Sequence, residues 1–206
     1  MHWRELSRAI EEFRLVRRRT IAITAGLSDD KGDKRARNGK WSAAEVLDHL
    51  VQTEIAFRKY ERQALEQARA GITTPIRIGF DEVNTRLRPL PSRWMPLLTP
   101  FLLGLHAVTP FAVRLLVMRK PGLVWAAAPK ISEPIGGRAV ADLRVELTAE
   151  IAITAALFEG ELPAVLPRIR AIHPLYGRND IAQVIRLMAA HEQRHQHQLT
   201  ALLKGL

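Results

Sequence analysis

The sequence predicts an all-α protein, a four-helix bundle with a long hydrophobic insertion between the second and third helices. Four segments carry apolar residues at helical spacing, whereas strand signals are confined to one short stretch, TTPIRIGF. Amphipathic helices bury their apolar stripes most simply against one another, as a bundle. The 206 residues suffice for one sizeable core, so we expect a single domain over residues 1–206.

The first helix is expected from about Trp3 to Leu27. Its apolar residues follow helical spacing, at Leu6, Ile10, Phe13, Val16 and Ile21. The segment that follows, SDDKGDKRARNGK, is polar, aperiodic and contains glycine, and it is expected to be a loop.

The second helix has a clear start in the sequence WSAAEVLDHL. Ser42 followed by Glu45 predicts a capping box, in which each side chain bonds to the backbone N–H of the other residue. The inner face continues through Val46, Leu50, Thr53 and Phe57, and Gly71 is expected to end the helix.

The insertion, about residues 72–138, is the least regular part of the chain and holds nine of the twelve prolines. Within it, the 20 residues Trp94–Val113 include no Asp, Glu, Lys or Arg. This length matches a bilayer span, but Pro96, Pro100 and Pro110 interrupt it. We expect the stretch to pack against the protein's own helices. A homodimer contact is the second expectation, and membrane contact through Trp94–Val113 is the least favoured.

The remaining two helices are expected at about residues 139–159 and from residue 181 to Leu203. Between them, ELPAVLPRIRAIHPLYGRND contains three prolines and is expected to be a proline-rich connection. Asn179 or Asp180 can cap the last helix, because a short polar side chain accepts from the first free N–H groups.

Charge and cysteine content narrow the function classes. The 31 basic and 21 acidic residues give a net charge of +10, but no nucleic-acid-binding motif is present. We therefore expect a solvated basic face and no nucleic-acid partner; the basic residues are densest at Arg14, Arg17, Arg18, Arg19, Lys31, Lys34, Arg35, Arg37 and Lys40. The chain has no cysteine, which excludes disulfides, thiolate ligands and a cysteine nucleophile. No secretory signal pattern is found at the N-terminus, so a cytoplasmic location is expected.

Two histidines in the last helix indicate a metal site. In MAAHEQRHQHQL, His191 and His195 are four residues apart and project about 40° from each other on a helix. They share the apolar stripe of Leu187 and Leu199, so both face the core. Two buried imidazoles in succession are difficult to satisfy without a metal or polar partners. His197, about 200° round the helix from His195, is expected to be exposed.

The same residues form the His-Glu-x-x-His pattern of zinc peptidases, in which Glu192 would be the general base. Such sites take a third ligand from further along the chain, but after His195 there is no Asp, no Glu and no histidine except His197. His49 is the better third ligand, since it lies on the core-facing side of the second helix. Asp48, next to it, is expected to face solvent.

Two stretches, WSAAEVLDHLVQTE and HPLYGRNDIAQVIRLMAAHEQRHQHQL, resemble the two signatures of the DinB superfamily, the DinB/YfiT-like metalloenzymes. The residues that match are Trp41, His49, His173, Pro174, Gly177, His191, Arg194, His195 and Gln198. The long hydrophobic insertion departs from the family pattern.

The resemblance implies a four-helix bundle that holds a divalent metal through one histidine of the second helix and two of the last. These correspond to His49, His191 and His195. The family includes thiol-dependent transferases and isomerases, and it is not a peptidase family, so Glu192 needs no catalytic role. Three imidazoles suit zinc, nickel or iron. Because the chain lacks cysteine, any thiol would come from a low-molecular-weight cofactor.

Three functions follow, in order of preference. The first is a metal-dependent enzyme, a thiol transferase or a hydrolase, that acts on a small-molecule substrate; Thr53, Gln52 and Gln198 are then candidates to hydrogen-bond around the site. The alternative is a non-catalytic binding bundle with a structural metal or none, whose insertion contacts a partner or a membrane. The weakest is a metallopeptidase.

Overall fold

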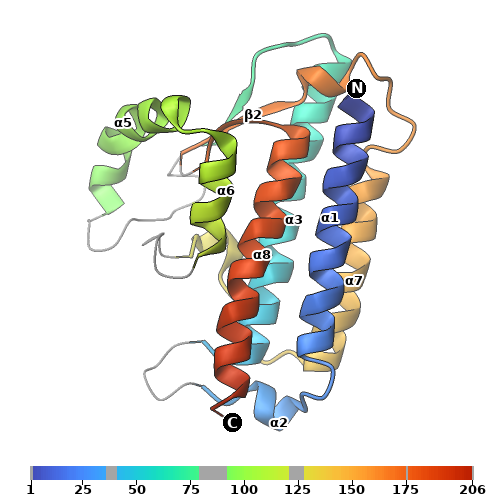
Figure 1. Cartoon of the computed structure of the whole chain (residues 1–206), viewed down its shortest axis with the longest axis vertical. Helices are drawn as coiled ribbons and strands as arrows, with labels where there is room; N and C mark the ends of the chain where they lie inside the picture. Colours follow the sequence, from blue (N-terminus) through green and yellow to red (C-terminus); the bar gives the residue numbers. More distant parts are fainter. Residues whose placement is uncertain (1, 36–40, 79–91, 121–127, 175, 206) are drawn as a thin grey trace.

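Four long helices form a bundle in the computed structural model, which describes residues 2–35, 41–78, 92–120, 128–174 and 176–205. They are α1 His2–Ile23, α3 Ala43–Arg69, α7 Val140–Ala156 and α8 Ile181–Leu203 (Figure 1). The chain descends in α1, ascends in both α3 and α7, and descends again in α8 (Figure 1). Because α3 and α7 run in the same direction, the chain between them must return along the length of the bundle. The prediction of an all-α bundle is confirmed.

Both helices that carry the histidines begin with the caps that the sequence predicts. Ser42 Oγ accepts from the Glu45 N–H at 3.1 Å, and the Glu45 carboxylate accepts from the Ser42 N–H at 2.8 Å. At α8, Asp180 Oδ1 accepts from the Gln183 N–H at 2.8 Å, and Gln183 Oε1 accepts from the Asp180 N–H at 3.1 Å. These reciprocal bonds fix where each helix starts and so set the height of its histidines in the bundle.

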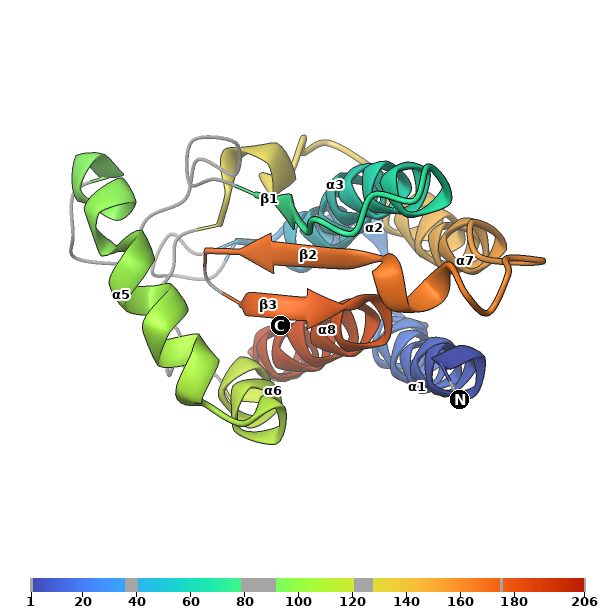
Figure 2. The same ribbon diagram turned by 90° about the horizontal axis from the view of Figure 1, so that it is seen from above.

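A small three-stranded sheet lies across one end of the bundle (Figure 2). Its strands are β1 Ile76–Arg77, β2 Arg170–His173 and β3 Gly177–Asp180; β1 pairs parallel to β2, and β2 pairs antiparallel to β3. The strand expected in TTPIRIGF is found at β1. The proline-rich connection before α8 contains the β2–β3 hairpin, which the sequence pattern did not indicate. Gly177 makes this turn feasible with a φ of +71°, which favours glycine.

The segment expected to be an insertion includes two helices, α5 Met95–Val108 and α6 Phe111–Arg119, after the short helix η1 Ser92–Trp94. α6 packs on α8 through Phe111, Leu115 and Met118, against Leu187 and Ala190. The short helix η2 Lys130–Ser132 then leads toward α7, and η3 Leu166–Arg168 precedes β2. A short helix, α2 Asp29–Gly32, also lies in the stretch after α1 that was expected to be loop.

α5 differs from expectation, because it stands away from the bundle (Figure 2) and leaves Leu97, Phe101 and Val108 exposed. Among the described residues no single helix is long and apolar enough to cross a membrane. α5 and α6 together reach that length and composition, but the chain bends by 115° between them.

The bundle core is divided by a polar layer. One apolar cluster lies toward the sheet and includes Phe13, Leu65, Phe158 and Ile185, whereas the other includes Leu47, Leu143 and Leu199. Between them along the helices lie the buried charged residues Arg17, Glu54 and Glu192. The candidate metal site is at the level of the second cluster, next to this layer.

Candidate metal centre

α3 and α8 bring three histidines together in the bundle. His49 and His195 are buried, and His191 is partly exposed. The predicted ligand set therefore converges: one ligand nitrogen from each ring can be chosen so that all lie within 4.8 Å of one another. His197, two residues after His195, is exposed as predicted.

The spacing of the ring nitrogens fits a metal ion. His191 Nε2 lies 3.5 Å from His49 Nε2 and 3.2 Å from His195 Nε2. Two nitrogens bound at about 2.0–2.1 Å in tetrahedral geometry are separated by about 3.3 Å. Nε2 of His191 thus stands at a metal-compatible distance from both other rings, and the three rings meet in edge-on orientations.

Two rings are oriented through their other nitrogen. The Nδ1–H of His49 donates to the carbonyl oxygen of Ser132 at 2.6 Å, because a carbonyl can only accept. The Nδ1–H of His195 donates to Gln198 Oε1 at 3.0 Å. Both rings therefore keep the lone pair on Nε2, which is the tautomer that binds a metal through that atom. Trp41 packs on His49 with ring centroids 4.8 Å apart.

All three imidazoles are held in the neutral form that ligation requires. Burial lowers the pKa of His49 to about 4, although Ser132 and Asp48 act in the opposite direction. Burial, with repulsion from His49, lowers the pKa of His195 to about 3. The pKa of His191 also lies well below its ordinary value, through burial and repulsion from the two other rings. At neutral pH no proton competes for the three lone pairs.

Asp48 is buried, so the expectation that it faces solvent is wrong. Its Oδ2 accepts from the backbone N–H of Ile135 at 2.6 Å and of Gly136 at 3.0 Å, and its Oδ1 accepts from Arg138 at 3.0 Å. Asp48 therefore fastens the segment that follows Ser132 onto α3. This contact places the Ser132 carbonyl over His49, so it supports the orientation of the ring.

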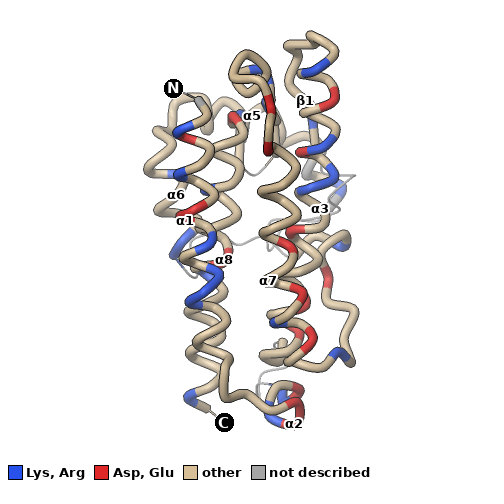
Figure 3. Tube along the Cα trace, turned by 90° about the vertical axis from the view of Figure 1, so that its right-hand side faces the viewer, with Lys and Arg blue, Asp and Glu red and all other residues tan. Residues whose placement is uncertain are grey.

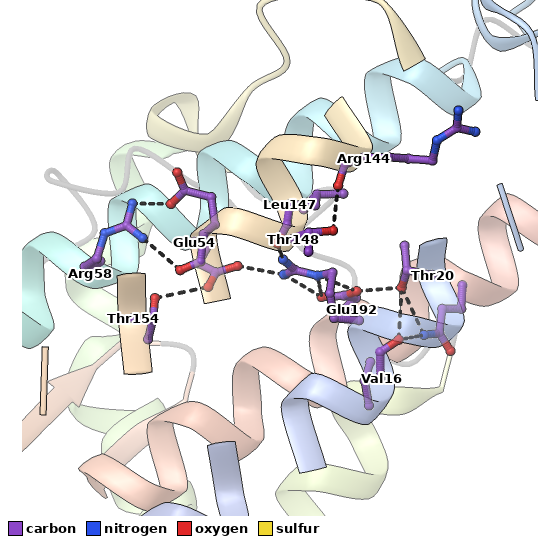
Figure 4. A network of polar contacts seen from close by, with 12 residues as sticks. Val16, Thr20, Glu54, Arg58, Arg144, Leu147, Thr148, Thr154 and Glu192 are labelled. Atoms are coloured by element: carbon purple, nitrogen blue, oxygen red, sulfur yellow. Dashed lines mark hydrogen bonds and ion pairs between the residues drawn. The ribbon is translucent and has the colours of Figure 1, made fainter. Parts of the chain in front are cut away.

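Glu192 points into a buried ion pair with Arg17 of α1, beside Thr20 (Figure 4). Its two oxygens accept from Arg17 Nε at 3.0 and 3.1 Å, and Thr20 Oγ1 donates to it at 2.5 Å. Both oxygens are therefore occupied on the α1 side. This removes the general-base role that a zinc peptidase would give Glu192.

Arg17 also joins the other two bundle helices. It donates to Glu54 Oε2 of α3 at 2.6 Å and to the Leu147 carbonyl of α7, while Thr154 donates to Glu54 Oε1 at 3.1 Å. The expectation that Arg17 belongs to a solvated basic face is wrong, because this side chain is buried. Its neighbours Arg18 and Arg19 are exposed, and the basic stretch of α1 can be followed in blue in Figure 3.

The remaining predicted residues divide between the site and the structure around it. Gln198 lies at the site, as described. Gln52 donates to Asp48 at 3.3 Å, and the buried Thr53 hydroxyl has no hydrogen-bond partner among the described residues. His173 lies outside the cluster, with its ring stacked on Tyr176 at 4.3 Å and on Phe57 at 6.0 Å.

Sequence reasoning missed Arg17, Glu54 and Ser132. For two of these residues the sequence does contain an indication of burial. Arg17 follows Phe13, and Glu54 follows Leu50, at the four-residue spacing of an apolar stripe. A charge at such a position implies a buried partner. Ser132 acts through its backbone, so its side chain could give no signal.

A family model described as the DinB superfamily matches residues 12–199 of the 206-residue chain. The chain belongs to the DinB superfamily. This membership agrees with the helical bundle and with the three-histidine cluster, and it confirms the resemblance seen in the two motifs. Neither the curated proteins nor the solved structures include a match to this DinB-superfamily chain.

Proposed function

We propose that this DinB-superfamily protein is a metal-dependent enzyme that binds one divalent ion through His49, His191 and His195. Zinc, nickel and iron all suit three imidazoles. The observation that carries the proposal is the convergence of three neutral rings, two of which turn Nε2 inward because Nδ1 is hydrogen-bonded elsewhere. The Nε2–H of a neutral His191 can donate to only one of the other two rings at a time, so one Nε2 lone pair is left without a donor among the three rings unless a cation binds there.

A divalent ion held by His49, His191 and His195 would supply Lewis-acid chemistry, because it would lower the pKa of a bound water or thiol so that either could act as a nucleophile. Two reaction types follow: transfer of a low-molecular-weight thiol to an electrophilic small molecule, and hydrolysis. In the transfer, sulfur forms a bond to carbon, the leaving group departs with its electron pair, and the thiol proton passes to solvent. We favour the transfer because the family includes thiol-dependent transferases.

The chain's own residues prepare the site rather than react. Ser132 and Gln198 orient two rings, and Asp48 holds the segment that carries Ser132. The Thr53 hydroxyl, one helical turn after His49 on α3, is buried and free to bond to a substrate or a water. The partly exposed His191 marks the side from which a small molecule can approach.

The test is metal analysis followed by two activity assays. The protein is purified without a histidine tag or chelator, and its metal content is measured by plasma mass spectrometry. Glutathione and cysteine are then offered with 1-chloro-2,4-dinitrobenzene, and 4-nitrophenyl acetate is offered alone. We expect about one ion per chain and an activity that chelation removes and the metal restores. A parent protein that binds no zinc, nickel or iron at micromolar concentrations would refute the proposal.

A further inference from the structure

α5 exposes a continuous apolar stripe. Exposed large apolar side chains recur at intervals of three or four residues, from Trp94 at the end of η1 through Leu97, Phe101, Leu105 and Val108 of α5. Leu97, Phe101 and Val108 are 71, 69 and 78% exposed. On the neighbouring α6, Val113 and Leu116 are also exposed. A helix that is apolar on all sides is normally buried, and contiguous apolar surface of this kind marks an interaction site.

Within the chain segment that carries the stripe, the charged residues have one sign. Residues 92–120 contain no Asp and no Glu, whereas Arg93 lies in η1 just before α5, and Arg119 and Lys120 lie at the end of α6, all three exposed. Apolar side chains flanked by exposed basic residues, with tryptophan at the edge, are typical of a helix that lies in the surface of an anionic membrane.

A second copy of the chain fits this surface less well. The common symmetric dimer places the same patch of each subunit face to face. Such a contact would bring the basic residues of both copies together, and no acidic residue of 92–120 could pair with them. The net charge of +10 on each chain adds to this repulsion.

The packing of α6 on α8 prevents α5 and α6 from crossing a bilayer together. Phe111, Leu115 and Met118 hold α6 on α8, and the chain turns by 115° before α5. α6 therefore belongs to the folded body and cannot continue α5 through a bilayer. α5 stands away from the bundle (Figure 1), and the side chains of its stripe are exposed.

We infer that α5 is a membrane-docking helix that inserts Leu97, Phe101 and Val108 into the surface of a bilayer containing anionic lipids, with Arg93, Arg119 and Lys120 against the headgroups. The docking is peripheral, so the bundle and its histidines stay in water next to the lipid surface. This inference does not depend on the proposed enzyme function.

The experiment is co-sedimentation of the whole protein with vesicles. One set is pure phosphatidylcholine and the other an equimolar mixture of phosphatidylcholine and phosphatidylglycerol. We expect the parent to sediment with the mixed vesicles and to bind the neutral ones far more weakly. Replacing Arg93, Arg119 and Lys120 together by glutamine should weaken binding to the mixed vesicles by about fivefold per residue, or roughly a hundredfold.

The apolar contribution is tested with the double variant Leu97→Asp, Phe101→Asp. It should stay in the supernatant while its helical circular dichroism is unchanged, because both side chains are exposed. Val145→Asp is the matched control, since Val145 is 71% exposed but lies on α7. It should bind as the parent does. The inference is overturned if the parent fails to bind mixed vesicles, or if the double variant binds like the parent. It is also overturned if light scattering shows a dimer that the double variant abolishes without any vesicle binding.

Discussion

The Nδ1–H of His49 donates to the carbonyl oxygen of Ser132 at 2.6 Å, and this bond turns the Nε2 lone pair toward His191 and His195. The ring is thereby prepared for ligation before any ion binds. It also ties α3 to a segment 83 residues further along the chain. The ligand set can be tested directly because α8, which carries His191 and His195, also carries the exposed His197.

Each of His49→Ala, His191→Ala and His195→Ala should reduce bound metal from about one ion per chain to nearly none. Removing one of three ligands should weaken metal binding by far more than the 10–100-fold loss that follows when a residue hydrogen-bonded to a ligand is replaced. Metal content after dialysis, measured by plasma mass spectrometry, provides the test. The matched control is His197→Ala, which removes an exposed imidazole two residues from His195 and should bind like the parent. Full metal content in His49→Ala would show that His49 is not a ligand.

Gln198→Ala should keep the ion but bind it about 10–100-fold more weakly. Its side-chain oxygen accepts from His195 Nδ1 at 3.0 Å, so without it the ring can rotate and adopt the other tautomer. Competition with a coloured chelator measures the change in affinity. If Gln198→Ala and the parent gave the same affinity, the contact would have no part in orienting the ring.

Glu192→Gln should destabilise the fold and leave metal content unchanged. The substitution removes one charge from the buried pair with Arg17, and breaking such a pair costs about 3–5 kcal/mol in the free energy of unfolding. Urea denaturation measures this loss, and metal analysis supplies the second readout. A contradicting result would be metal-dependent cleavage of casein by the parent that is lost in Glu192→Gln. Such a loss would show that Glu192 acts as a general base.

Glu61 predicts a dependence of stability on pH. This carboxyl group is buried, neither oxygen has a hydrogen-bond partner among the described residues, and burial together with Glu54 raises its pKa from 4.5 to about 8. Between these values the folded chain holds a proton that the unfolded chain releases. Stability therefore falls as the pH rises from about 4.5 through about 8, and the loss is complete above that range.

Replacing this carboxyl group by an apolar one, in Glu61→Met, should raise the free energy of unfolding by about 1–3 kcal/mol at pH 9 and by less at pH 5. Urea titrations at the two pH values measure the difference. Glu66→Met is the control, because Glu66 is exposed on the same helix and should show no such dependence. An equal gain at both pH values would mean that Glu61 is not protonated in the folded protein.

Much of the bundle could be predicted because local patterns determine it. The Ser42–Glu45 and Asp180–Gln183 pairs start α3 and α8 through bonds that span three residues. The four-residue spacing of His191 and His195 places both on one face of α8. Only the assumption that α3 neighbours α8 was needed to add His49, and the structure shows these helices in contact through the three rings.

The features that the sequence analysis did not predict depend on partners far away in the sequence. β2 is a strand because β1 and β3 pair with it, and β1 lies about a hundred residues earlier. Asp48 next to an apolar stripe looks like a solvent-facing residue until the backbone of residues 135–136 reaches it. The stripe of α5 was expected to pack against the protein's own helices, because apolar composition predicts burial. Composition alone does not identify the surface that buries such a stripe. The description of residues 72–138 as an insertion stays a prediction.

Arg17 bonds to Glu54, Leu147 and Glu192, so a single side chain of the first helix contacts the three other helices of the bundle. A ribosome makes these partners in that order, and Glu192 follows Arg17 by 175 residues. While synthesis proceeds, Glu54 can neutralise the guanidinium, but Thr20 and the rest of the α8-facing surface of α1 stay open to water. We therefore expect the bundle to close late, when α8 emerges, and the apolar side chains of α1 that face α8 to stay exposed until then.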